Sequence, residues 1–201
     1  LRINFFTTED IMHSAIIEFI AGMVESACRK ESNVFGYEVW THHILNVVKF
    51  GKMLAEEFKA DGEVVEIAAL LHDYAGIMDS SLYDEHHYHG AVEAGKILER
   101  LDYPAEKIKL VKHCIFSHRS SRQIEKKTDE AICVASADAM AHIDQIPSLL
   151  HLAYSGYNMS TDEGVEWVRN KISRSWNKLC PAGKEIIGDK YNCVMKILDS
   201  N

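Results

Sequence analysis

Apolar residues recur along most of this chain at spacings of three and four positions, which is the spacing of one face of an α-helix. The first such stripe comprises Ile16, Ile17, Ile20, Met23 and Val24. Further helices are predicted over residues 37–58, 63–72, 86–101, 104–118 and from 128 onward, and three more in the segments delimited by Pro147, residues 155–160 and Pro181. Residues 74–85 look irregular and polar. Because no segment shows the alternating pattern of a strand, an all-α fold is expected.

Length and composition favour a single globular domain. The 201 residues suffice for one sizeable core, and 47% hydrophobic with 26% charged residues is ordinary for a soluble protein. We therefore expect one helical-bundle domain over residues 1–201. Its motif-bearing core would cover about residues 37–145, with an N-terminal helix at 7–31 and the C-terminal helices at 146–201 packed on that core.

Charge and cysteine content exclude some classes of partner. The formal net charge of −8 disfavours a nucleic-acid groove or an anionic membrane surface, so no nucleic acid or membrane partner is expected. No apolar run reaches membrane-spanning length. The five cysteines are odd in number and lack Cys-x-x-Cys spacing, which is typical of reduced thiols in a cytoplasmic protein.

A helix-forming run from Ile67 ends abruptly in His72 and Asp73, and Gly76 follows within one turn. Apolar residues precede the pair without an intervening charge after Ile67, so the histidine and the carboxylate should lie at the buried end of a core helix. Burying an ionised aspartate without a partner costs several kcal/mol. The stretch therefore predicts a bound cation, provided that other ligands lie nearby.

Helical phase selects further candidate ligands. His43 is in register with the apolar residues that follow it, whereas the adjacent His42 shares a face with polar residues and is expected to be exposed. His118 continues an apolar stripe of its helix, and small alanines flank Asp138. Among His86, His87 and His89 we prefer His89, because Gly90-Ala91 behind it permits close approach of another backbone.

The order His…His-Asp…His…His…Asp resembles the HD-domain superfamily of metal-dependent phosphohydrolases. The blocks that carry the resemblance are His43–Val47, Ala68–Asp73, His89–Ala91, Cys114–Arg119 and Ala135–Ala139, and they span about residues 37–145. The resemblance implies that His43, His72, Asp73 and Asp138 bind a first metal ion and that His89 and His118 join a second. With one ion only, His89 and His118 would be outer hydrogen-bond donors. Imidazole and carboxylate ligands suit Fe, Mn, Ni, Co or Zn.

The function implied is hydrolysis of a small phosphorylated metabolite or nucleotide by a metal-bound hydroxide, with Asp73 and Asp138 as catalytic residues. Many relatives carry a basic residue after the His-Asp pair, whereas this chain has Tyr74. Arg119 directly follows a predicted ligand, and we expect it to bind the substrate phosphate. Two alternatives remain open at this point: a di-iron oxygenase built on the same His/Asp set, and a nucleotide sensor without catalysis.

Overall fold

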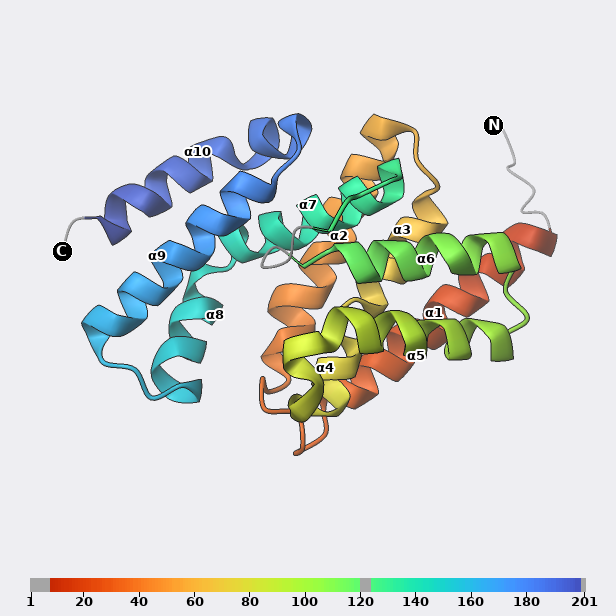
Figure 1. Ribbon diagram of the computed structural model, residues 1–201, viewed down its shortest axis with the longest axis horizontal. Coiled ribbons are helices and arrows are strands. Elements are labelled where there is room, and N and C mark those ends of the chain that lie inside the picture. Colours follow the sequence, from red (N-terminus) through yellow and green to blue (C-terminus); the bar gives the residue numbers. More distant parts are fainter. Residues whose placement is uncertain (1–7, 120–123, 200–201) are drawn as a thin grey trace, which may run out of the picture.

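The computed structural model describes residues 8–119 and 124–199, which form helices and connecting turns without any β-strand (Figure 1). This confirms the predicted all-α fold. Within the described part of the chain, no helix combines the length and the apolar character that crossing a bilayer requires.

The first three predicted helices are present with small differences. Helix α1 spans Thr8–Cys28, the π-helical turn η1 spans Val39–Ile44 and runs directly into α2 at Leu45–Phe58, and α3 spans Gly62–Leu71. The predicted helix 37–58 is thus interrupted near its start by a π-helical turn that contains His42 and His43. Such turns are rare and often occur at functional sites, since they change the direction of the side chains that they carry.

The segment after Asp73 is more regular than the prediction of an irregular loop over 74–85. It forms a short helix, α4, at Tyr74–Met78 and a 3₁₀ turn, η2, at Ser80–Glu85. The Asp79 side chain accepts hydrogen bonds from the backbone and the hydroxyl of Ser81 and so caps the 3₁₀ turn. Polar capping residues look like loop residues in a sequence, but here they begin a helical turn.

The remaining helices agree closely with the predicted ones. They are α5 at His86–Arg100, α6 at Ala105–Ser117, α7 at Asp129–Asp144, α8 at Ile146–His151 with the π-helical turn η3 at Leu152–Gly156, α9 at Thr161–Lys178, and α10 at Pro181–Leu198. In Figure 1, α5 and α6 lie side by side near α1, while α8, α9 and α10 lie toward the other end of the molecule.

Helix α7 lies at the centre of the bundle and contacts α2, α3, α6, α9 and α10. Most of its residues from Ala131 to Ile143 are buried, and five of them are alanines. Small side chains on every face allow several helices to approach the same axis. Two polar residues of α7, Asp138 and His142, therefore lie where helices from both halves of the chain meet.

The N-terminus of α7 depends on one hydroxyl. The Thr128 Oγ1 atom accepts a hydrogen bond from the Ala131 backbone N–H at 3.2 Å, and Asp129 and Glu130 lie in the first turn. Thr128→Ala should lower the free energy of unfolding by about 1 kcal/mol, because one backbone N–H loses its acceptor. Thr128→Ser keeps the cap and should stay close to the parent. Chemical denaturation of the three proteins checks this, and equal stability of the alanine and serine variants would contradict it.

Candidate metal centre

Seven ionisable side chains converge where several helices end. His72 and Asp73 lie between α3 and α4, His43 lies in η1, His86 begins α5, His118 ends α6, and Asp138 and His142 lie on α7. They form three groups that could each hold a metal ion, with the donor atoms of each group within 4.8 Å of one another. The groups are His43–His72–Asp73, His43–Asp138–His142 and Asp73–His86–His118.

The two carboxylate oxygens of Asp73 face different histidines. The Oδ2 atom lies 3.2 Å from His72 Nε2 and 3.4 Å from His43 Nε2. The Oδ1 atom lies 3.2 Å from His86 Nε2 and 3.7 Å from His118 Nε2. Asp73 is therefore placed as a carboxylate that could bridge two adjacent ions, one on each side.

Three of the histidines are held in the same way. The Nδ1 atoms of His72, His86 and His118 lie 2.8, 2.6 and 2.6 Å from the backbone oxygens of Ala69, Tyr83 and Ile115, each three residues earlier. A carbonyl can only accept, so each Nδ1 carries the proton and donates it. In the neutral ring, Nε2 then presents a lone pair to the centre of the cluster, as a metal-binding histidine requires.

The short distances between the ring nitrogens point to a cation as well. His43 Nε2 lies 3.2 Å from His72 Nε2, and His86 Nε2 lies 3.1 Å from His118 Nε2. Two lone pairs at such a distance repel each other unless a proton or a metal ion lies between them. The neutral Nε2 donors and two carboxylates form a ligand set that suits divalent transition metals, so the residues present fit such an ion.

Without a metal, protons would balance the carboxylates. Burial opposes the charged form of His72, but the Asp73 charge outweighs it and raises the pKa of His72 to about 9. Burial lowers the pKa of His118 to about 3, and the His72 charge adds to this effect. Burial alone would raise the pKa of Asp73, yet its contacts with His72 and His43 hold it well below the usual range.

Asp138 is shared between the cluster and a lysine from the C-terminal part of the chain. Its Oδ1 atom lies 3.5 Å from His43 Nε2 and 3.3 Å from His142 Nδ1, while its Oδ2 atom lies 2.5 Å from Lys178 Nζ. Burial would raise the pKa of Asp138, but the Lys178 ammonium and the neighbouring histidines hold it well below the usual range. Lys178 leaves Oδ1 as the oxygen available to a metal ion.

The sequence model of the HD domain matches residues 40–142, about half of the chain, and this range contains the whole convergent His/Asp set. The chain belongs to the HD-domain family. Within the matched range, Asp73 belongs to two of the three candidate metal groups and His72 to one of them. No curated protein matches the chain.

Solved structures with the same fold cover nearly the whole HD-domain chain. A Listeria innocua protein is 19% identical with a TM-score of 0.68, and the match covers 94% of each chain. Bacillus subtilis YpgQ is 18% identical with a TM-score of 0.71, over 93% of this chain and 94% of YpgQ. A predicted HD superfamily hydrolase from an uncultured Thermotogales bacterium is 19% identical with a TM-score of 0.51, over 86% and 91% of the two chains.

Five of the six predicted ligands lie in the cluster, namely His43, His72, Asp73, His118 and Asp138. His89 does not belong to any of the three groups, and His86 takes the place predicted for it. The close approach expected at Gly90 does occur, since a Cβ there would lie 3.2 Å from Ile115 Cγ2 and 3.4 Å from the His72 oxygen. However, the buried face of α5 runs from His86 through Gly90 and Ala94, and His89 lies beside this face, half-buried against Tyr88.

His142 belongs to the cluster although helical phase had not selected it. It lies one turn after Asp138 on α7, and its ring stacks on His43 with 4.7 Å between the ring centroids. Because residues four positions apart share a helix face, this spacing was a signal that could have identified it. His42 is exposed, as predicted.

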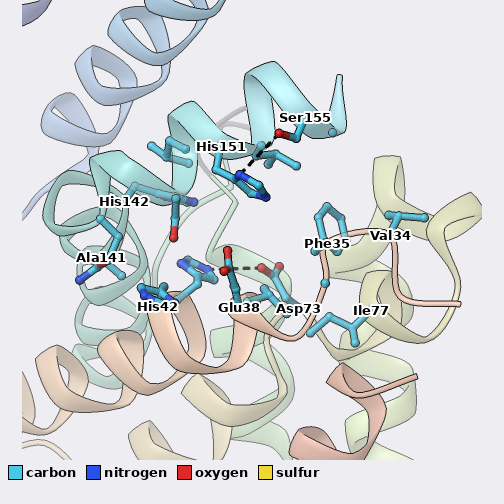
Figure 2. Close-up of a pocket in the computed structure, with 18 of the residues that line it drawn as sticks. Val34, Phe35, Glu38, His42, Asp73, Ile77, Ala141, His142, His151 and Ser155 are labelled. Carbon is cyan, nitrogen blue, oxygen red and sulfur yellow. Dashed lines mark hydrogen bonds and ion pairs between the residues drawn. The ribbon is translucent and has the colours of Figure 1, made fainter. Parts of the chain in front are cut away.

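Two cavities adjoin the cluster. The first, which we call the polar cavity, has a volume of about 350 Å³ and is lined by Asp73, His118, Asp138, Arg119, Lys171 and Arg174, among others. The second, the side cavity, has about 290 Å³ and lies between residues 34–39, Ile77 and the segment 141–156 (Figure 2). Asp73, Tyr83, His142 and Lys171 line both cavities, so the two adjoin at the cluster.

Because His86, and not His89, lies in a candidate metal group, the number of bound ions can be tested directly. His86→Ala should reduce the metal content from two ions to one, because the Asp73–His86–His118 group loses a donor and leaves too few protein ligands. His89→Ala is the matched control and should leave the metal content unchanged. Elemental analysis of protein purified without chelator measures both. Loss of metal in the His89 variant alone would contradict the ligand assignment, and one ion in every variant would indicate a single-metal site.

The buried Lys178–Asp138 pair leads to a second prediction. The exposed fractions of the two side chains are 5% and 8%. Lys178→Met leaves a buried carboxylate without its cation, so the metal-free protein should lose about 3–5 kcal/mol of unfolding free energy. Lys190→Met removes the equally short but more exposed ion pair with Asp144, which joins α10 to α7, and should cost about 0–1 kcal/mol. Chemical denaturation distinguishes the two, and equal small losses would contradict the prediction.

Proposed function

We propose that the chain is a metal-dependent phosphohydrolase that acts on a small phosphorylated metabolite or nucleotide. The observation that carries this proposal is the pairing of the Asp73-centred cluster with three cationic side chains across the polar cavity, Arg119, Lys171 and Arg174. The chain as a whole has a net charge of −8. A local group of cations beside a metal site therefore fits a substrate with a concentrated negative charge, such as a phosphoryl group.

Lys171 is the most informative of the three cations. It is half-buried on α9, and its ammonium has no hydrogen-bond or ion-pair partner within residues 8–119 and 124–199; its nearest aromatic contact is the Trp167 ring at 5.9 Å. Burial lowers the pKa of Lys171, although Asp138 and Asp73 partly oppose this effect. Arg174 lies one turn further along the same helix. An unpaired, partly desolvated cation is stabilised by an anion that enters the cavity.

Arg119 borders the same cavity, in keeping with the role expected from its position after His118. Its guanidinium donates a hydrogen bond to the Asp84 backbone oxygen, which connects the end of α6 to the turn before α5. Within residues 8–119 and 124–199 this guanidinium has no further hydrogen-bond partner, and its remaining donors can pair with phosphate oxygens. The residues directly after it, 120–123, lie outside the described part of the chain.

The residues then have separate tasks. Divalent ions, when bound, would acidify a water molecule and take up negative charge on the phosphoryl oxygens. Asp73 and Asp138 hold the ions and orient the attacking water. Lys171, Arg174 and Arg119 bind the phosphoryl oxygens and keep the phosphorus in line with that water, so that hydrolysis yields phosphate and an alcohol or a shortened phosphate. In support, one solved structure of Bacillus subtilis YpgQ, with a TM-score of 0.67 to this chain, is described as a complex with ADP.

The first test is metal-dependent turnover. Protein loaded in turn with Mn, Fe, Co, Ni or Zn ions should hydrolyse at least one member of a panel of phosphomonoesters, phosphodiesters and nucleotides. Asp73→Ala should lose both metal and turnover while its helix content stays unchanged. One carboxylate oxygen of Asp73 faces His43 and His72, and the other faces His86 and His118, so the substitution removes a ligand from both groups. Asp144→Ala, on the outside of α7, is the control. Absence of hydrolysis with every ion would contradict the proposal, and oxygen-dependent turnover of the iron form would favour an oxygenase.

A second test asks whether the cations of the polar cavity bind the substrate, with variants that leave the metal ligands unchanged. Lys171→Met should lower kcat/KM by about ten-fold or more, which is the expected effect of losing one charge-assisted contact with phosphate, and metal content should be unchanged. Lys184→Met is a matched control. Lys184 is also half-buried and lies 5.5 Å from the Trp176 ring, but it lines neither cavity. Equal kinetics in the two variants would show that Lys171 does not contact the substrate.

A further inference from the structure

The side cavity differs in character from the polar cavity that it adjoins. Its walls include the apolar side chains of Phe35, Val39, Ile77, Leu149 and Leu152. In Figure 2, His151 at the end of α8 and Ser155 of η3 lie on one side of this space and Phe35 and Ile77 on another, and Asp73 and His142 also face it. The cavity therefore extends from the metal cluster into a mostly apolar space between the loop 34–39 and the segment 145–156.

Aromatic rings connect this space to the cluster. The Phe35 and Tyr83 rings lie 5.4 Å apart at their centroids, and Tyr83 in turn stacks on the ring of His86, at 5.3 Å and with 20° between the ring planes. One wall of the cavity is thus a run of rings that ends at a candidate metal ligand. Flat apolar groups pack favourably against such a wall, either stacked or edge to face.

The charges decide which part of a substrate can occupy the side cavity. Lys171 is the one lysine or arginine among its described lining residues, and it stands at the junction with the polar cavity. Glu38 also lines the side cavity and would repel an anion. The polar cavity, by contrast, has Arg119, Lys171 and Arg174. A phosphorylated substrate at the cluster would therefore direct its phosphoryl oxygens toward the polar cavity and its uncharged part toward the side cavity.

The size of the side cavity limits that uncharged part. A cavity of ~150 Å³ with apolar walls is known to accommodate one benzene ring. The side cavity has about 290 Å³, which is enough for a single or fused ring system and more than a methyl or hydroxymethyl group would fill. Polar side chains such as Gln145 and Ser155 also line the cavity, but hydroxyl groups of a small sugar that lie against Phe35, Ile77 and Leu152 would lack hydrogen-bond partners, which is unfavourable.

We propose that the side cavity binds the organic group of the substrate and selects phosphate esters whose organic group has an aromatic or otherwise apolar face. This inference rests on the proposed phosphohydrolase function and adds the chemical class of the substrate. The residues that confer the preference are Phe35, Val39, Ile77, Leu149 and Leu152, and they lie apart from the cations that bind the phosphoryl group.

The test uses two phosphonates that cannot be hydrolysed, phenylphosphonate and methylphosphonate, titrated by calorimetry into the Mn²⁺-loaded protein. Phenylphosphonate should bind about ten-fold tighter or more, because its ring is buried against apolar walls. Ser148→Trp places a large side chain into the side cavity from α8 and should remove this preference, while the affinity for methylphosphonate stays within about two-fold of the parent. Ser14→Trp, at an exposed position of α1, is the matched control and should keep the preference.

Equal affinities of the parent for the two phosphonates, or absence of binding of either, would overturn the inference. A preference that survives in Ser148→Trp with an unchanged magnitude would also overturn it, because the ring would then be bound elsewhere. Binding is measured without turnover, so this outcome is separate from that of the proposed function. Hydrolysis of phosphate esters without a phenyl preference refutes the side-cavity assignment alone, and a phenyl preference without hydrolysis refutes the phosphohydrolase alone.

Discussion

The position of the Asp73 carboxylate is the constraint on which the site depends. An ionised carboxylate inside a helical bundle has to be matched by cations or hydrogen-bond donors, and each oxygen of Asp73 has two imidazole nitrogens close to it. These imidazoles come from η1, from the end of α3, from the start of α5 and from the end of α6. Helix ends can supply such ligands because their chain direction changes there and side chains from different helices can meet at one point.

The part of the chain beyond the matched HD-domain range completes this arrangement. Lys178 at the end of α9 lies 2.5 Å from Asp138 and 2.9 Å from the backbone oxygen of His118, so one ammonium connects α7, α9 and the end of α6. Lys171 and Arg174, on the same helix, line the polar cavity. Helix α9, which carries none of the predicted ligands, thus holds the cation that orients one carboxylate of the cluster and two of the cations beside it.

Helical periodicity predicted most of the architecture because the signal is repeated over many residues. The same signal identified His43 and His118, which are in register with apolar residues of their helices, whereas Asp138 was identified by the small alanines that flank it. Periodicity did not decide among His86, His87 and His89, because this histidine run begins its helix and no earlier turn defines the buried face. The choice of His89 therefore depended on Gly90-Ala91, whereas the buried face runs from His86 through Gly90. Residues 74–85 were misread because α4 and η2 are too short to show a period. Neither cavity could be predicted, since each is lined by segments that are distant in the chain.

The side cavity and the polar cavity are formed by different stretches of the chain. The loop 34–39 and the segment 145–156 form most of the side cavity, whereas α9 and Arg119 supply the cations of the polar cavity. None of the residues of the His/Asp cluster lies in either of these stretches, although His43, Asp73 and His142 also line the side cavity. Changes in these two short segments would therefore alter the proposed binding of the organic group and leave the His/Asp cluster intact. Such a division would allow new specificities to evolve by substitutions in these segments around a constant metal centre.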